Sequence, residues 1–213
     1  MVHSSRELDA AISDGKVALV HCVEGGFHLG ADPESVERAV ARLARHGVAY
    51  VTLAHLFWRG VATNANALPF LSDCVYRLLF PQPSQGLSEL GRAAVTAMVR
   101  ERMLIDVAHM SERAFTETLD LLNELDPART VPVLASHSAY RFGGQHYGLT
   151  APMLRRIAER GGVVGLIFAQ HQLLDGLGRR EAASLEQSLG VLCEHIDAIA
   201  RRAPTATRAS ART

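Results

Sequence analysis

Short apolar segments alternate with amphipathic ones along this chain, and this alternation constrains the fold more than any other feature. The apolar segments predict buried strands, and they cover residues 16–23, 48–53, 103–108, 131–136 and 162–168. Three of the four steps between them are about 30 residues long, which is the length of a strand–helix–strand unit. The alternation therefore predicts parallel strands covered by helices, in either a barrel or an open doubly wound sheet.

The intervening segments carry helix start signals. Capping residues stand at Ser4, Asp32, Ser88, Ser111 and Thr150, each directly before an amphipathic stretch. A last helix is predicted over residues 182–202, where Leu and Ile recur at helical spacing. Residues 57–86 lengthen the second step and contain several Asn and Pro residues, so we expect a long loop there.

Composition excludes several classes of protein. The chain has 213 residues with 22 Lys and Arg against 22 Asp and Glu, so no net basic field would attract nucleic acid or an anionic membrane. The aliphatic runs stay far below the roughly 18 residues of a membrane span. Hydrophobic residues make up 48% of the chain, which is enough to bury a core and argues against wholesale disorder.

The cysteines and the two ends suggest where the chain works and where its domain stops. Three cysteines far apart in the sequence favour neither a disulfide framework nor a cysteine zinc site. The first residues lack the apolar stretch of a signal peptide, so we expect a cytoplasmic protein. One domain is predicted over residues 1–202, and residues 203–213 read as a disordered or out-of-frame tail.

Chemistry-bearing side chains stand where four consecutive predicted strands end. They are Glu24, His55, His109 and His137. Because the carboxyl ends of parallel strands meet at one edge of a sheet, these groups are expected on the same rim. One carboxylate with several imidazoles and no thiolate is typical of a hydrolytic zinc centre. Each histidine taken alone is more often structural, and only their repetition in phase with the strands favours a site.

Other candidate motifs are weaker. Ser136 beside His137 could suggest a serine nucleophile, but adjacent strand residues point to opposite faces, which disfavours that interpretation. Arg141 and Tyr147 follow the fourth strand and could meet a substrate carboxylate, although a solvated loop explains them equally well. No phosphate-binding glycine loop is present, so a nucleotide-binding module has little support.

Two histidine motifs point to a known family. Residues 103–111 read MLIDVAHMS and residues 133–140 read VLASHSAY, with Glu24-Gly-Gly ahead of them and GGVVGLIF at 161–168. Together these resemble the membrane (renal-type) dipeptidase family of zinc metallopeptidases, within the amidohydrolase-like TIM barrels. The resemblance covers roughly residues 5–200. It implies an α/β fold that is a partial (β/α)8 TIM barrel of about five parallel strands with covering helices.

The resemblance also implies roles for individual residues. Glu24 would bridge two zinc ions, His109 and His137 would hold one of them, and His55 would contact the substrate. Arg141 and Tyr147 would lie where the family binds the substrate carboxylate. The expected function is zinc-dependent hydrolysis of dipeptides or similar small amides, with at most one well-formed zinc site in this chain.

The chain departs from the family pattern at both ends. The first-strand His-x-Asp motif has no counterpart before Lys16, and the last-strand Asp has none after residue 202. The alternative hypothesis is therefore a non-catalytic remnant of a metallodipeptidase. Such a chain would leave two sheet edges unpaired, so a homo-oligomer is a further expectation.

Overall fold

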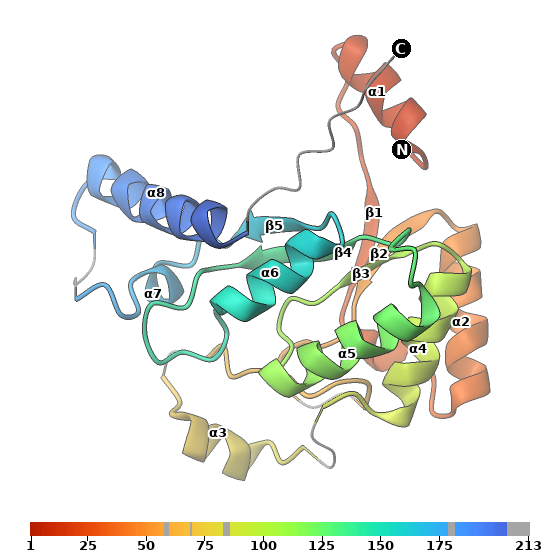
Figure 1. The fold of residues 1–213 in the computed structure, drawn as a ribbon, viewed down its shortest axis with the longest axis horizontal. Helices are drawn as coiled ribbons and strands as arrows, with labels where there is room; N and C mark the ends of the chain where they lie inside the picture. The colour runs from red at the N-terminus through yellow and green to blue at the C-terminus, as the bar shows by residue number, and fades with distance from the viewer. Residues whose placement is uncertain (58–59, 69, 83–85, 179–181, 204–213) are drawn as a thin grey trace.

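The fold is built on one parallel sheet. The computed structural model describes residues 1–57, 60–68, 70–82, 86–178 and 182–203. Its strands are β1 (His21–Glu24), β2 (Val48–Thr52), β3 (Leu104–Asp106), β4 (Val133–Ser138) and β5 (Val163–Leu166), in the spatial order β1-β2-β3-β4-β5 (Figure 1). A doubly wound sheet reverses its strand order, whereas consecutive strands of a β/α barrel lie in sequence order. The predicted α/β fold with five parallel strands is confirmed. The strand order is that of a β/α barrel and not of a doubly wound sheet.

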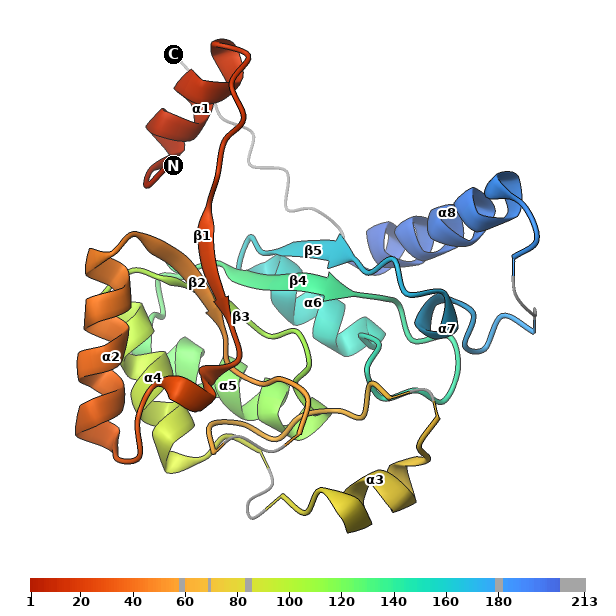
Figure 2. The ribbon, with the colours of Figure 1, turned by 180° about the vertical axis from the view of Figure 1, so that it is seen from behind.

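Helices follow the strands, and most begin at the predicted caps. They are α1 (Ser5–Ser13), α2 (Pro33–Arg45), α3 (Asp73–Leu79), α4 (Glu89–Arg100), α5 (Glu112–Leu125), α6 (Ala151–Glu159), α7 (Gln170–Leu173) and α8 (Leu185–Arg202), with a short 3-10 helix, η1 (Gly26–His28). The side chains of all five predicted caps accept a hydrogen bond from a backbone N–H in the first turn. Helices α2, α4, α5 and α6 line one side of the sheet in chain order (Figures 1 and 2).

The core lies between the sheet and these helices. Val51, Ile105 and Val133 occupy matching register positions on β2, β3 and β4, and each is at most 1% exposed. Phe115 of α5 and Leu154 of α6 pack into the same apolar cluster. Because side chains alternate along a strand, the neighbouring residues Thr52 and Asp106 point to the other face, toward the candidate site.

The first strand differs from its prediction. A buried strand was expected over residues 16–23, but β1 covers only His21–Glu24 and the segment before it is exposed. Val17 is 88% exposed and Leu19 61%. This segment leads to α1, which projects from the rest of the fold in both ribbon views. An apolar run predicts burial, but it does not reveal whether a second strand lies beside it and covers it.

The long segment and the last helix also differ in detail. The predicted loop at 57–86 contains helix α3, whose cap Ser72 was overlooked. The last helix begins at Leu185 rather than near residue 182, and residues 179–181 lie outside the described residues. Residues 204–213 of the predicted tail also lie outside them, so the domain boundary near residue 202 stays a prediction.

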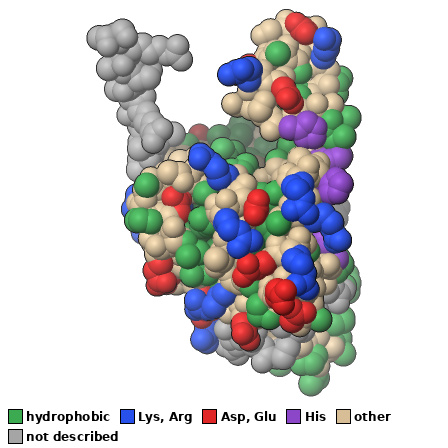
Figure 3. Space-filling view, turned by 90° about the vertical axis from the view of Figure 1, so that its right-hand side faces the viewer, with side chains coloured by type: hydrophobic (Ala, Val, Ile, Leu, Met, Phe, Trp, Pro, Cys, Tyr) green, Lys and Arg blue, Asp and Glu red, His purple; other side chains and the backbone are tan. Residues whose placement is uncertain are grey.

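On the face drawn in Figure 3, acidic and basic side chains are interspersed, and histidines gather along its right-hand edge. Across the part of the chain that the structure describes, no helix has both the length and the apolar character needed to cross a bilayer.

Candidate metal centre

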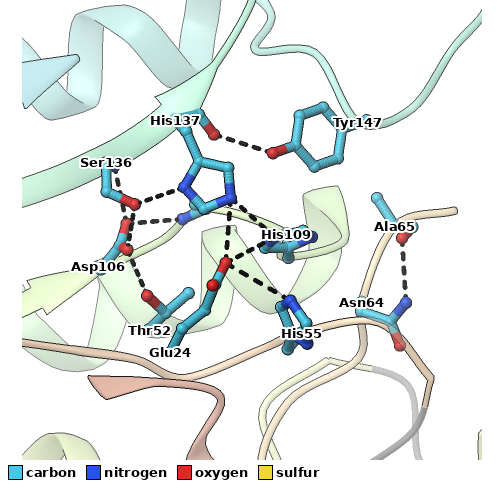
Figure 4. A network of polar contacts seen from close by, with 11 residues as sticks. Glu24, Thr52, His55, Asn64, Ala65, Asp106, His109, Ser136, His137 and Tyr147 are labelled. Carbon is cyan, nitrogen blue, oxygen red and sulfur yellow. Dashed lines mark hydrogen bonds and ion pairs between the residues drawn. The ribbon is translucent and has the colours of Figure 1, made fainter. Parts of the chain in front are cut away.

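Four strands deliver the predicted site residues to one place. Glu24 is the last residue of β1, and His137 lies within β4. His55 and His109 each follow the end of their strand, β2 or β3, by three residues. Figure 4 shows the four side chains converging, with the Glu24 carboxylate at the centre.

The ring nitrogens surround one carboxylate oxygen. The Oε1 atom of Glu24 lies 3.5 Å from Nε2 of His55, 3.3 Å from Nε2 of His109 and 3.2 Å from Nε2 of His137. The Nε2 atoms of His109 and His137 are 2.9 Å apart. Ligand atoms of Glu24, His55 and His109 all lie within 4.8 Å of one another. His55, expected to touch the substrate, is thus also placed as a candidate ligand.

This arrangement fits a small divalent cation. Ligand atoms bonded to zinc at about 2.0–2.1 Å in a tetrahedron stand about 3.3 Å apart, close to the distances among Glu24, His109 and His137. Two imidazole nitrogens 2.9 Å apart repel through their lone pairs unless a proton or a cation lies between them. Nδ1 of His109 is buried and has no hydrogen-bond partner among the described residues, so a hydrogen bond on that side does not explain the ring's orientation.

The local backbone is shaped to present these groups. Gly25 has φ of +91°, and a Cβ on it would lie 2.4 Å from the Phe27 ring, so only glycine fits directly after Glu24. His109 has φ of +64°, an uncommon conformation for a residue with a side chain. The N–H of Ala65 donates to the His109 carbonyl at 2.7 Å and helps to hold it there.

Burial sets the protonation state of the central histidine. Burial, followed by the neighbouring His137 and His55, lowers the pKa of His109 to about 3. Its imidazole is therefore neutral at neutral pH, which is the form that binds a metal. Burial and the negative charges of Asp106 and Glu24 raise the pKa of Tyr147, so its hydroxyl keeps its proton.

The two predicted substrate-binding residues both already have hydrogen-bond partners. The Tyr147 ring lies 5.2 Å from the His109 ring, and its hydroxyl donates to the His137 carbonyl at 3.0 Å. Arg141 donates to the carbonyls of Gly148 and His146 and to the Glu112 carboxylate. Its guanidinium is committed to its own loop and to α5. Carboxylate binding by Arg141 would require some of these bonds to break, and both substrate roles stay predictions.

Sequence reasoning overlooked a second group of polar residues behind the histidines. The Asp106 carboxylate is fully buried and accepts hydrogen bonds from the hydroxyls of Thr52 and Ser136. Ser136 Oγ also lies 2.8 Å from Nδ1 of His137. The expectation that adjacent residues 136 and 137 point apart is therefore wrong. The reason is a register shift in β4 between Ala135 and Ser138, which breaks the regular alternation. A buried Asp in a strand was the available signal.

Comparison with known proteins decides the family. The model of the membrane dipeptidase family, peptidase family M19, matches residues 1–203. The chain belongs to the membrane dipeptidase family. The predicted resemblance is confirmed.

Individual relatives agree with this membership. The chain is 30% identical over 162 residues to an uncharacterized dipeptidase of Schizosaccharomyces pombe, covering 74% of this chain and 33% of the relative. It is 30% identical over 169 residues to a dipeptidase of Claviceps purpurea, covering 79% and 34%. The chain thus spans about a third of the length of these two dipeptidases.

Solved structures share the fold. A metallopeptidase from Rhodobacter sphaeroides, solved with a phosphinate mimic of the dipeptide L-Ala-D-Ala, superposes with a TM-score of 0.68 at 24% identity and covers 94% of this chain and 51% of its own. A probable dipeptidase from Pseudomonas aeruginosa gives 0.69 at 21% identity, covering 95% and 58%. At this identity the likeness establishes a shared fold, and this dipeptidase-family chain corresponds to about half of each structure.

Proposed function

We propose that this chain binds zinc at Glu24, His109 and His137 and uses that site to hydrolyse dipeptides or similar small amides. The observation that supports the proposal most is the convergence of three Nε2 atoms on one oxygen of Glu24, from four different strands or strand ends. Chance rarely gathers a carboxylate and three imidazoles within hydrogen-bond distance, and zinc hydrolases use this ligand set.

The proposed ligands Glu24 and His109 have different roles at the zinc site. When bound, a zinc ion supplies Lewis acidity that polarises a carbonyl and makes water a stronger acid. Glu24 brings the negative charge, and its side chain is 49% exposed, which leaves room for substrate. His109 is neutral and 7% exposed, so it serves as a fixed ligand.

His55 and Tyr147 face the same space. The His55 side chain is 29% exposed and its Nε2 points toward Glu24, so it can donate a hydrogen bond to a developing oxyanion on the substrate. The Tyr147 hydroxyl holds the His137 carbonyl and closes one side of the site. We propose that both groups position the substrate rather than bind the metal.

The test begins with metal binding by the purified chain. Zinc titration by calorimetry should show a saturable site that Glu24→Gln and His109→Ala weaken strongly. His171→Ala is the matched control, because His171 is exposed and follows the fifth predicted strand by three residues, in helix α7. It should bind zinc as the parent does. Equal binding by all four proteins would refute the metal centre.

Activity is measured separately on a panel of dipeptides with the zinc-loaded chain. Turnover that disappears in His109→Ala and persists in His171→Ala would support the proposed hydrolysis. A folded, zinc-binding chain without turnover on any dipeptide would instead favour the non-catalytic alternative. Binding of a phosphinate dipeptide mimic, the ligand class seen in the Rhodobacter structure, reports on the substrate site independently of turnover. Parallel titrations with cobalt and manganese test the choice of zinc.

A further inference from the structure

Behind the candidate ligands lies a carboxylate whose surroundings are all hydrogen-bond donors. Asp106 is 0% exposed. Its Oδ1 accepts from the N–H groups of Ala108 and Ser136, each at 3.0 Å. Its Oδ2 accepts from the hydroxyls of Thr52 at 2.5 Å and Ser136 at 2.6 Å (Figure 4). The two N–H groups can only donate, and with the two hydroxyls they match the four acceptor sites that a carboxylate offers.

This carboxylate decides which way the Ser136 hydroxyl points. A distance of 2.6 Å between the oxygens is typical of a hydroxyl that donates to an ionised carboxylate. A hydroxyl has one proton, so Ser136 Oγ has only lone pairs left for its other neighbour. That neighbour is Nδ1 of His137, 2.8 Å away. Nδ1 must therefore carry the proton and donate it to Ser136.

We propose that Asp106 and Ser136 form a relay that fixes His137 in its Nδ1-protonated form and thereby turns the Nε2 lone pair toward Glu24. His137 Nε2 lies 3.2 Å from Glu24 and 2.9 Å from His109, so a proton on Nε2 would occupy the space of the cation. Ligating histidines are commonly oriented by a hydrogen bond from their other nitrogen, and loss of that partner weakens metal binding about 10–100-fold. This inference rests on the proposed metal centre, and Asp106 acts in it as a positioning residue.

The Asp106→Asn variant separates this role from a purely structural one. The amide oxygen can still accept the two backbone N–H groups, while its NH2 group replaces Oδ2 and donates to Ser136 Oγ. The Ser136 proton is then directed to Nδ1 of His137, and the histidine proton moves to Nε2. Ser136→Ala removes the connection, whereas Ser136→Thr keeps the hydroxyl and suits a strand.

The control variant acts on the same carboxylate without touching the relay. Thr52→Val removes the other hydroxyl that donates to Oδ2 and leaves the bond from Ser136 to Asp106 in place. If Asp106 only tied the ends of β2, β3 and β4 together, Thr52→Val and Asp106→Asn would have similar effects on the site.

The decisive measurement is the nitrogen NMR spectrum of the histidine rings in the metal-free, full chain, at mildly alkaline pH where imidazoles are neutral. His137 should be protonated on Nδ1 in the parent, Thr52→Val and Ser136→Thr proteins, and on Nε2 in Asp106→Asn. Zinc affinity from chelator competition should fall about 10–100-fold in Asp106→Asn and Ser136→Ala, and should stay within about threefold of the parent in the other two.

The outcomes distinguish the relay from the metal centre. An Nε2-protonated His137 in the parent, or an unchanged ring in Asp106→Asn, overturns the relay even if zinc binds. The predicted ring changes without zinc binding in the parent would uphold the relay and refute the proposed function. Correct ring changes with unaltered zinc affinity would show that the relay does not serve metal binding, which also overturns this inference.

Discussion

The middle of the sheet and its two edges are held by different means. Strands β2, β3 and β4 pack against helices α2, α4 and α5, with Val51, Ile105 and Val133 buried. At the edges, Val163 of β5 is 63% exposed, and Val17 stands exposed before β1. Helix α1 has no buried residue, whereas α5 has six. The fold is therefore stabilised from its centre, and its edges contribute little.

The candidate metal centre combines residues from the middle of the sheet and from one of its edges. His109 comes from the buried middle of the sheet, and Glu24 comes from an edge strand, with a side chain 49% exposed. The proposed Asp106 relay orients His137, the buried core surrounds His109, and the position of the Glu24 carboxylate depends on β1. A bound cation would join the edge to the middle, so metal binding and the order of β1 should change together.

The largest effect is expected from removing one aromatic ring in the middle. Phe115 is 1% exposed in α5, and Phe168 is 83% exposed just after β5. Phe115→Ala leaves a cavity and should lower the free energy of unfolding by about 3–5 kcal/mol. Phe168→Ala should change it by no more than about 0.5 kcal/mol. Urea unfolding followed by fluorescence or circular dichroism measures both, and equal losses would show that the two regions are not different.

The second effect connects the two regions through the metal. At a free zinc concentration of 100 times the dissociation constant, binding should raise the free energy of unfolding by about 2.7 kcal/mol. Hydrogen exchange of the β1 amides should slow on zinc addition, with a smaller change in β3, and a chelator should reverse both effects. Glu24→Gln serves as the control, because it should lose most of the stabilisation. Slower exchange in β1 of that variant as well would place the metal elsewhere.

Most of the strands and caps could be predicted from the sequence, including the edge strand β5, and the extent of β1 could not. Buried strands and capped helices have local signals, so β2, β3 and β4 and the cap Ser111 were found within a few residues. Exposure of the segment before β1 depends on what pairs with that edge, which no local pattern encodes. The predicted extent of the first strand was therefore wrong.

The candidate site also has a part that the sequence predicts and a part that it does not. The convergence of Glu24, His55, His109 and His137 could be predicted, because side chains at the ends of neighbouring parallel strands meet at one rim. The Ser136–His137 contact was missed because it depends on a register shift in β4. The committed hydrogen bonds of Arg141 depend on a folded loop and on α5, so its sequence position could not reveal them.

The third prediction compares two helix caps with the same chemistry. Ser111 caps α5 in the middle, and Ser4 caps α1, which projects from the fold. Ser111→Ala should lower the free energy of unfolding by about 1 kcal/mol, because α5 forms only with the core. Ser4→Ala should leave the global transition in place and increase only the fraying of α1, seen as faster hydrogen exchange there. A global loss for Ser4→Ala would mean that α1 folds cooperatively with the sheet.

The smallest effect is electrostatic and depends on pH. Burial raises the pKa of the Glu117 carboxyl, but hydrogen bonds from Arg113 and the Leu87 N–H outweigh it and hold the pKa below its ordinary value. A depressed pKa in the folded state stabilises the fold above the pKa of the unfolded chain, about 4.3, and this stabilisation disappears as the pH falls through the folded value. Glu117→Gln should therefore cost about 0.2–1 kcal/mol at neutral pH, and the difference from the parent should shrink in acid.

Asp32→Asn, at an exposed carboxylate, is the control for Glu117→Gln. Asp32 caps α2, is fully solvated, and its pKa is lowered mainly by the Ser35 N–H. Asn caps a helix about as well as Asp, so Asp32→Asn should leave stability nearly unchanged at neutral pH. In acid the variant should lose less stability than the parent, because the lowered pKa of Asp32 contributes to the parent's decline. Unfolding curves of both variants across the acid range test the pair. A pH-independent cost in Glu117→Gln would show that the negative charge of Glu117 does not account for its contribution to stability.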